Sequence, residues 1–166
     1  MRVVRWLAIA VGVLVLFVAS IFVVARFHDG PLGLAPGGPL VAGEVVTAPV
    51  GDWGFATAIE TVELQLDGES SSRTTWILVE GGRAYIPVSL SFPPGKRWHK
   101  AADQNGAAWV RIAGQRYPVT LTRVQDETLR SQLIGVVGNK YSGGPPGQTG
   151  TADGVWFFEV ASRAAG

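Results

Sequence analysis

Apolar and polar residues are spaced differently in three successive stretches of the chain. In the first stretch, from Trp6 to Ala25, only Ser20 carries a polar side chain. Twenty helical residues rise by about 30 Å, which is the thickness of the hydrocarbon core of a bilayer. We therefore predict an N-terminal transmembrane anchor in residues 1–26, with residues 3–25 in contact with membrane lipid.

A cleavable signal peptide is the alternative for this stretch. Its apolar region is usually about 7 to 15 residues long and ends in a small-x-small site. Val18-Ala19-Ser20 weakly resembles such a site, but residues 21–24 continue the apolar run beyond it. We expect an uncleaved anchor, and the signal peptide stays open as the alternative.

The positive charges around this helix predict its orientation. Arg2 and Arg5 precede the helix, whereas Arg26 follows it and is soon offset by Asp29. Because cytoplasmic flanks carry the excess of Lys and Arg, the N-terminus is expected in the cytoplasm. The chain is then a single-pass protein of the inner (cytoplasmic) membrane, and its domain is extracytoplasmic, or periplasmic in a Gram-negative cell.

The second stretch, residues 27–52, contains ten Gly and Pro among its 26 residues. Such a composition favours little regular structure, and we interpret the stretch as a Gly/Pro-rich linker that lifts the domain off the bilayer. Apolar residues within it, such as Leu40 and Val45, leave open that parts of it pack on the domain instead.

The third stretch, residues 53–166, alternates apolar and polar residues with the period of two that is typical of half-buried strands. Val62, Leu64 and Leu66 share one face of the first strand. A strand over residues 74–79 is followed by a Gly-Gly turn and a strand over residues 84–90, which together indicate a hairpin.

A second hairpin is predicted from residues 107–112 and 115–124, which are joined by Ala113-Gly114. A last strand is expected at residues 155–160, after a Gly/Pro-rich loop. Six or so antiparallel strands without a βαβ rhythm favour a closed or partly closed barrel.

Two short helices complete the predicted domain. One is expected within residues 97–104. The other begins after Asp126, whose side chain can cap a helix N-terminus. Its apolar residues lie three to five positions apart on one face, so this helix should cover an opening or edge of the barrel; they are Leu129, Leu133, Ile134 and Val137.

Charge and composition exclude several classes of function. Residues 27–166 contain eleven Lys and Arg against thirteen Asp and Glu, a net charge of −2, whereas a general nucleic-acid binder is basic. With no Cys and two His, a zinc site is not predicted. The chain also lacks a Gly-x-Ser-x-Gly elbow and a P-loop, which disfavours hydrolase and nucleoside triphosphatase functions.

A basic cluster at Lys96, Arg97, His99 and Lys100 is the main candidate for chemistry. Its charges suit a phosphate or carboxylate, although they are equally typical of a solvated helix face. His99 is the one histidine of residues 53–166 and a candidate general base, without an identifiable helper.

Other aromatic and basic side chains fit both a ligand role and a purely structural one. Four tryptophans could stack on a flat ring, but aromatic residues at strand positions are more often part of the core; they are Trp76, Trp98, Trp109 and Trp156. Arg111 and Arg116 flank the turn of the second hairpin and are predicted as exposed strand charges, with a ligand role as the alternative.

Three segments carry a resemblance to a known family. They are Lys96-Arg97-Trp98-His99-Lys100, the hairpin from Trp109 to Val119, and residues 73–82 with the sequence Arg-Thr-Thr-Trp-Ile-Leu-Val-Glu-Gly-Gly. Over residues 73–124, about a third of the chain, the sequence resembles the split β-barrel flavin-binding proteins. It is most similar to the deazaflavin-dependent nitroreductase branch and to the pyridoxamine phosphate oxidase-like proteins, as a divergent membrane-anchored member.

The resemblance implies a mainly β fold, a six-stranded antiparallel split β-barrel with two short helices, preceded by one transmembrane helix. It also implies a homodimer that holds FMN or a deazaflavin at the subunit interface and acts as a nitroreductase-like oxidoreductase. The residues that match the family's cofactor contacts are Arg73, Thr74, Thr75, Lys96 and Arg97 for the phosphate and Trp98 beside the ring. No catalytic residue and no metal ligand is assigned.

One segment departs from the family pattern. The Gly-Arg-Lys-Ser-Gly type of sequence before the first hairpin is replaced by Asp-Gly-Glu-Ser-Ser-Ser at residues 67–72. The carboxylates of Asp67 and Glu69 would repel a phosphate, so binding of a cofactor is either retained or lost. The alternative function is a non-catalytic envelope module that binds a partner protein or a small ligand.

Overall fold

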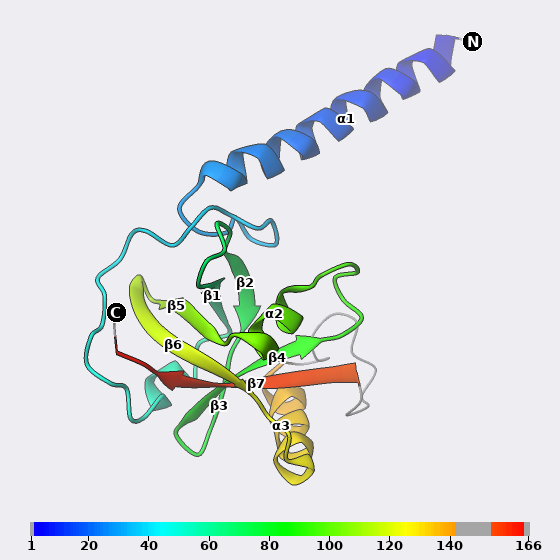
Figure 1. The fold of residues 1–166 in the computed structure, drawn as a ribbon. Coiled ribbons are helices and arrows are strands. Elements are labelled where there is room, and N and C mark those ends of the chain that lie inside the picture. The colour runs from blue at the N-terminus through cyan, green and yellow to red at the C-terminus, as the bar shows by residue number, and fades with distance from the viewer. Residues whose placement is uncertain (1, 142–153, 165–166) are drawn as a thin grey trace.

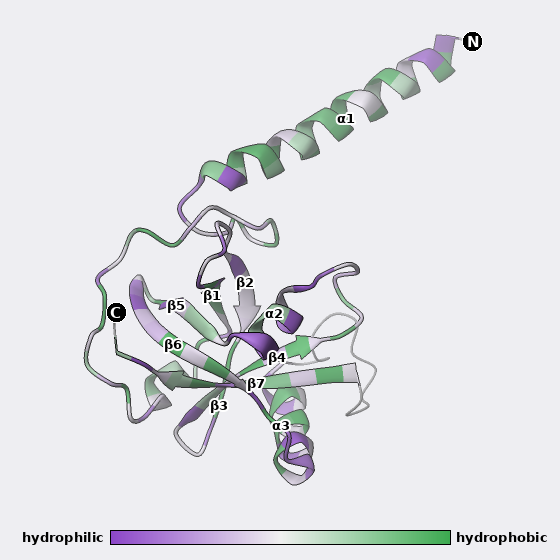
Figure 2. Cartoon of the chain, in the orientation of Figure 1, coloured by the Kyte–Doolittle hydropathy of each residue, from purple (hydrophilic) through white to green (hydrophobic). Residues whose placement is uncertain are grey.

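The computed structural model describes residues 2–141 and 154–164. One long helix projects from a small β-barrel (Figure 1). Helix α1 spans Arg2–Phe27, and Ala25 is its one buried residue. Its residues are hydrophobic over most of its length (Figure 2). By length and composition the helix can cross a membrane, a test that a signal sequence near the N-terminus also passes.

Seven antiparallel strands form one sheet in the order β2-β1-β5-β6-β7-β4-β3. The fold is therefore mainly β and nearly closed, as predicted. The strands are β1 Thr61–Leu66, β2 Arg73–Trp76, β3 Leu78–Glu80, β4 Arg83–Ser89, β5 Ala107–Ile112, β6 Gln115–Arg123 and β7 Val155–Ser162.

The strands form because alternate side chains enter the barrel. In β1, Val62, Leu64 and Leu66 are buried as predicted, while the residues between them are partly exposed. The second predicted hairpin is confirmed as β5 and β6, with Ile112 opposite Gln115. Ala113 and Gly114 both adopt positive φ, which matches the two-residue turn of a right-handed twisted hairpin.

The barrel closes through a bend at Ile77 rather than through a further ladder. Residues 74–79, predicted as one strand, are divided there into β2, which pairs with β1, and β3, which pairs with β4. The Ile77 N–H donates instead to the carbonyl of Glu60 at 3.2 Å. This division raises the strand count from the predicted six to seven.

The end of helix α3 (Glu127–Lys140) holds this bend in place. The Nζ atom of Lys140 lies 2.8 Å from the carbonyl oxygen of Ile77 and 2.6 Å from that of Ile59. The hydroxyl of Tyr141 lies 2.6 Å from the Ile77 oxygen and 2.7 Å from the Glu60 oxygen. These groups thus provide partners for the carbonyls of Ile59 and Ile77 and a second partner for that of Glu60.

The two predicted helices are confirmed. Helix α2 spans Trp98–Gln104, and the carboxylate of Asp126 accepts a hydrogen bond from the backbone N–H of Leu129 at 2.8 Å at the start of α3. Leu133 and Val137 are buried against one side of the sheet. The predicted Gly/Pro-rich loop before β7 lies largely outside the described residues.

Candidate functional site: a cavity between β2 and β4

A cavity of about 600 Å³ lies between β2 and β4, which stand apart in the hydrogen-bonded order of the sheet. The loop from β4 to α2 and part of the segment after α1 complete its wall. All six sequence-predicted contact residues line it: Arg73, Thr74, Thr75, Lys96, Arg97 and Trp98. The apolar wall is formed by Leu34, Pro36, Trp76, Pro87, Val88, Phe92 and Pro93.

Arg73 is the most enclosed charged side chain of this wall. It pairs with Glu69 through Nη2, and its guanidinium carbon lies 5.3 Å from the ring centre of Trp98. Its Nη1 atom is buried without a hydrogen-bond partner. Burial lowers the pKa of Arg73, although the Glu69 carboxylate opposes this shift and the guanidinium stays charged. A buried donor without a partner costs about 1–3 kcal/mol, so the site favours a ligand that brings an acceptor.

Lys96 holds the loop between β4 and α2 in position. Its ammonium group donates to the carbonyl oxygens of Ser89 and Phe92. Burial lowers its pKa from the usual value for lysine. Two of its three N–H bonds are thus used within the chain, and Lys96 shapes the cavity as well as contributing positive charge. Arg97, beside it, is exposed.

The two threonines differ in their availability. The Thr74 hydroxyl donates to the carbonyl of Gly33 at 2.7 Å, which leaves its oxygen free to accept but not to donate. Thr75 is half-buried in the cavity wall on the same strand.

The side chains of Trp98 and His99 lie in different surroundings. Trp98 lines the cavity, whereas His99 is 5% exposed and packs edge-on against Trp156 with ring centres 5.2 Å apart. Burial lowers the pKa of His99, and the positive charges of Lys96, Lys100 and Arg123 lower it further, while Asp103 opposes them. His99 is not among the residues that line the cavity, and its Nδ1 atom has no partner within the described chain.

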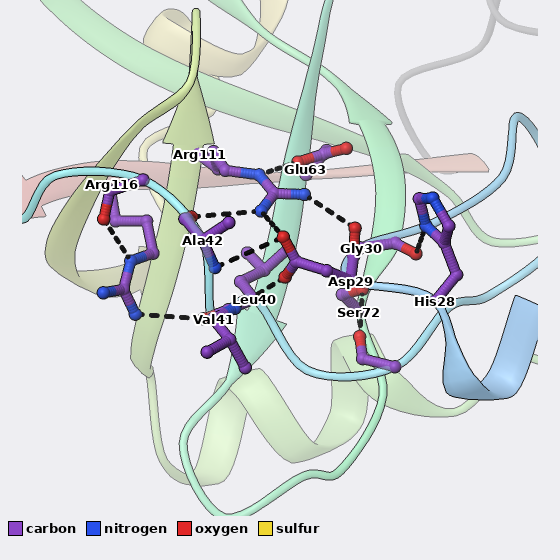
Figure 3. Close-up of polar contacts among 12 residues, drawn as sticks. His28, Asp29, Gly30, Leu40, Val41, Ala42, Glu63, Ser72, Arg111 and Arg116 are labelled. Atoms are coloured by element: carbon purple, nitrogen blue, oxygen red, sulfur yellow. Dashed lines mark hydrogen bonds and ion pairs between the residues drawn. The ribbon is translucent and has the colours of Figure 1, made fainter.

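Arg111 is not the exposed strand charge that the sequence predicted. Its side chain is 11% exposed and lies among Asp29, Glu63 and the segment after α1 (Figure 3). Nη1 donates to the Asp29 carboxylate at 2.8 Å and to the Ala42 carbonyl at 3.1 Å, while Nε pairs with Glu63. The prediction failed because β5 lies under the segment after α1, whose path the sequence does not show.

Arg116 also binds this segment rather than facing solvent alone. Its guanidinium donates to the carbonyl oxygens of Leu40 at 3.0 Å and Gly43 at 3.1 Å (Figure 3). The backbone N–H of Leu40 in turn donates to the Gln65 side chain at 2.8 Å. The Gly/Pro-rich stretch is thus bound along the barrel, which corresponds to the second of the two possibilities that the sequence left open.

Several cavity residues escaped the sequence analysis. Pro87 offered a signal, because a proline within a strand indicates an edge. At Pro87 and Val88, which line the cavity, β4 pairs with β7 on one side, and its ladder with β3 on the other side ends at Tyr85. Leu34 and Phe92 offered none, since each lies in a loop whose course depends on tertiary contacts. Of the four candidate tryptophans, Trp76 and Trp98 line the cavity, whereas Trp109 and Trp156 lie under arginine side chains elsewhere.

Within residues 2–141 and 154–164, no three His, Asp or Glu side chains gather in a way that could hold a metal ion.

Comparisons with known proteins give one type of match. No family model matches the chain, and no curated protein matches it. Among solved structures, the chain is similar to the crystal structure of a "Putative Pyridoxamine 5'-phosphate oxidase" from Listeria innocua, with 12% sequence identity and a TM-score of 0.47. The match covers 66% of this chain and 90% of that one.

Proposed function

We propose that this protein is a membrane-anchored split-barrel module that binds a flat, anionic small molecule in the cavity between β2 and β4. The family resemblance makes FMN or a deazaflavin the candidate ligand and nitroreductase-like oxidoreductase chemistry the candidate activity. The observation that carries the proposal is the buried Nη1 atom of Arg73, which lacks a partner beside the ring of Trp98.

The residues of the cavity fit such a ligand in charge, shape and size. Three basic side chains, Arg73, Lys96 and Arg97, stand against one acidic side chain, Glu69, so the wall carries net positive charge. The remaining wall is mainly apolar and includes Trp76 and Trp98. A volume of about 600 Å³ lies within the range of about 300–1,000 Å³ that is usual for small-molecule sites.

The chain's own residues would bind and orient the ligand. Arg73 would donate charge-assisted hydrogen bonds to a phosphate or carboxylate, and Arg97 would add positive charge at the exposed rim. Trp98 would lie against the ring, and the apolar wall would exclude water from it. A flavin-type cofactor supplies hydride or electron transfer when bound, while the protein supplies position and electrostatics.

The location and assembly of the module belong to the same proposal. Arg2 and Arg5, at the start of α1 and before its apolar run, support a cytoplasmic N-terminus and an extracytoplasmic, periplasmic barrel. The family resemblance supports a homodimer with the cavity near the subunit interface.

The experiment is a ligand titration of the full-length protein in lipid nanodiscs. An absorbance spectrum of the protein as isolated would show flavin or deazaflavin bands, and titration with FMN and with a deazaflavin would give a dissociation constant. Arg73→Met should weaken binding about tenfold or more, because a charged hydrogen bond contributes about 1.5–3 kcal/mol. Arg83→Met, at an exposed ion pair with Glu159 and away from the cavity, is the matched control. Absence of both bands and of any saturable binding would overturn the proposal.

The ion pair between Glu69 and Arg73 favours a second candidate function. The Glu69 carboxylate neutralises part of the positive charge of the cavity wall, as the phosphate of a bound ligand would. A non-catalytic envelope module that binds a partner protein or a neutral small ligand is consistent with that arrangement. Affinity capture of the tagged full-length protein from membranes separates the two functions, because a stoichiometric cofactor together with no specific partner would exclude the second.

A further inference from the structure

Two exposed apolar side chains border the cavity. Leu34 is 94% exposed and Phe92 is 43% exposed, and both line the cavity wall. Single exposed apolar residues are common on protein surfaces. These two, however, come from separate loops and line the same cavity. Phe27, at the end of α1, is 87% exposed. A surface of this kind is typical of contact with a membrane or a partner.

The loop that carries Leu34 also packs against the membrane helix. Leu32 and Ala35 form a small bridge, with N–H to carbonyl distances of 3.1 and 3.0 Å, so that Leu34 lies near the tip of a tight turn. Leu32 shares a small cleft with Ser20, Ile21 and Val24 of α1.

This contact fixes the height of the turn relative to α1. Ile21 precedes Phe27, the last residue of α1, by six positions, and at 1.5 Å per residue it lies about 9 Å back along the helix axis. Ile21 and Val24 both belong to the apolar run that is predicted to lie in lipid. The turn of residues 32–35 therefore reaches back to the level of the membrane-embedded part of the helix.

The same turn is fixed to the barrel beside the cavity. Thr74 of β2 donates to the Gly33 carbonyl at 2.7 Å, and Gly37 and Ser72 exchange two backbone hydrogen bonds of 3.0 and 3.2 Å. At the end of α1, Arg26 donates to the carbonyl and the hydroxyl of Ser70 at 2.5 and 2.7 Å. In Figure 1, the end of α1 and the turn after it lie over the end of the barrel at which β1 and β2 are joined.

We propose that the barrel rests on the bilayer through a membrane-facing rim, defined as Leu32, Leu34 and Phe92, and that the cavity opens at the lipid surface. Molecules that reach the cavity then come from the interfacial layer of the membrane, and the ligand or second reactant is an amphiphile that partitions into the bilayer. This inference rests on the proposed membrane anchoring but not on the identity of the cofactor.

Site-specific fluorescence quenching in vesicles tests the proposal directly. The chain has no cysteine, so a single introduced cysteine can carry an environment-sensitive fluorophore without removing native residues. The full-length variants are Leu34→Cys and Phe92→Cys at the rim, Val13→Cys in the middle of α1, and Glu80→Cys at the exposed end of β3 as the matched control. Each is reconstituted in phospholipid vesicles with acyl-chain spin-labelled lipid, and separately with aqueous iodide.

The labels at positions 34 and 92 should be quenched by the spin-labelled lipid at least about twofold more strongly than the label at position 80, because interfacial residues lie at the boundary of headgroups and acyl chains. Iodide should show the reverse order. Circular dichroism of each variant verifies that the barrel is folded.

The label at position 13 separates failure of the anchor from failure of the rim. If position 13 is quenched by lipid while positions 34 and 92 behave like position 80, the rim proposal is wrong and the anchor stands. If position 13 is not quenched by lipid, the anchor and the rim proposal are both wrong. Neither result affects binding of a flavin-type ligand, which the titration measures independently.

Discussion

Arg111 of β5 and Asp29, two residues after helix α1, form an ion pair in which Nη1 and Oδ2 are 2.8 Å apart. The Asp29 carboxylate also accepts hydrogen bonds from the backbone N–H groups of Val41 at 2.7 Å and Ala42 at 3.2 Å. Partial burial raises the pKa of Asp29, but these N–H groups and the Arg111 guanidinium outweigh that effect and leave the pKa below its usual value. One carboxylate thus joins the segment after α1 to the middle of the barrel.

Replacing Arg111 should loosen this segment and lower the stability of the barrel. We expect Arg111→Met to reduce the free energy of unfolding by about 2 kcal/mol, because charged hydrogen bonds to Asp29 and Glu63 are lost and Asp29 keeps its two backbone N–H partners instead. The exposed pair of Arg83 with Glu159 is the control, and Arg83→Met should cost less than about 1 kcal/mol. Urea denaturation in detergent measures both values, and equal losses would contradict the assignment of Arg111 as the main link.

Gly37 should not tolerate any side chain. A Cβ atom at this position would lie 1.7 Å from the carbonyl oxygen of Gly30, and backbone cannot move aside as a flexible side chain can. Gly37→Ala should therefore displace the turn of residues 30–38 from Ser72 and cost about 1–3 kcal/mol, the usual range for overpacking. At Gly51 a Cβ meets nothing within 4 Å, so Gly51→Ala is the matched control. Limited proteolysis should cut the segment after α1 faster in the Gly37 variant only.

The sequence predicts strands where one face alone is buried. β1 and β5 follow their alternating patterns closely, because each strand places every second side chain in the barrel. The bend at Ile77 was not predictable, since residues 74–79 contain no glycine or proline to indicate a break. The break depends on Lys140 and Tyr141, more than 60 residues away.

For the candidate site, the types of residue in the cavity wall were predictable, whereas the contacts that hold these residues in position were not. The family resemblance selected six residues that line one cavity, although their binding role stays a prediction. The sequence did not reveal that Glu69 would pair with Arg73, or that Leu34 would border the cavity, because both depend on how the turn of residues 67–72 and the segment after α1 fold onto β2.

Stability should fall in mildly acidic solution through His99. Burial and neighbouring positive charges lower the pKa of His99 in the folded state, so the unfolded chain binds a proton more readily. The free energy of unfolding should therefore decrease as the pH falls below about 6.5, the ordinary pKa of histidine, and level off below the folded-state pKa.

A comparison of His99→Phe with His28→Phe isolates this effect. The His99 variant keeps an aromatic ring against Trp156 but cannot titrate, so its stability should vary less between pH 7 and pH 5 than that of the wild type. His28 is exposed, and its variant is the control for replacing a histidine by phenylalanine. An unchanged slope in the His99 variant would show that other groups cause the acid sensitivity.

The bend at Ile77 should depend on the hydroxyl of Tyr141. This hydroxyl lies 2.6 Å from the Ile77 carbonyl oxygen in a partly buried position, and the ring packs against Trp76 with centres 5.3 Å apart. Tyr141→Phe keeps the ring packing and should lower the free energy of unfolding by about 1 kcal/mol. Tyr117→Phe is the control, because the Tyr117 hydroxyl bonds only to the exposed Gln115 side chain, which water can replace.

Alkaline titration gives the Tyr141 prediction a second measurement. Burial raises the pKa of Tyr141 to about 12, above the value of about 10 for tyrosine in an unfolded chain. A raised folded-state pKa means that its contribution to stability is complete below pH 10 and is lost as the pH rises toward 12. The stability difference between wild type and Tyr141→Phe should therefore shrink over that interval. A difference that stays constant from pH 9 to pH 12 would show that the Tyr141 hydroxyl does not hold the bend through a protonated hydrogen bond.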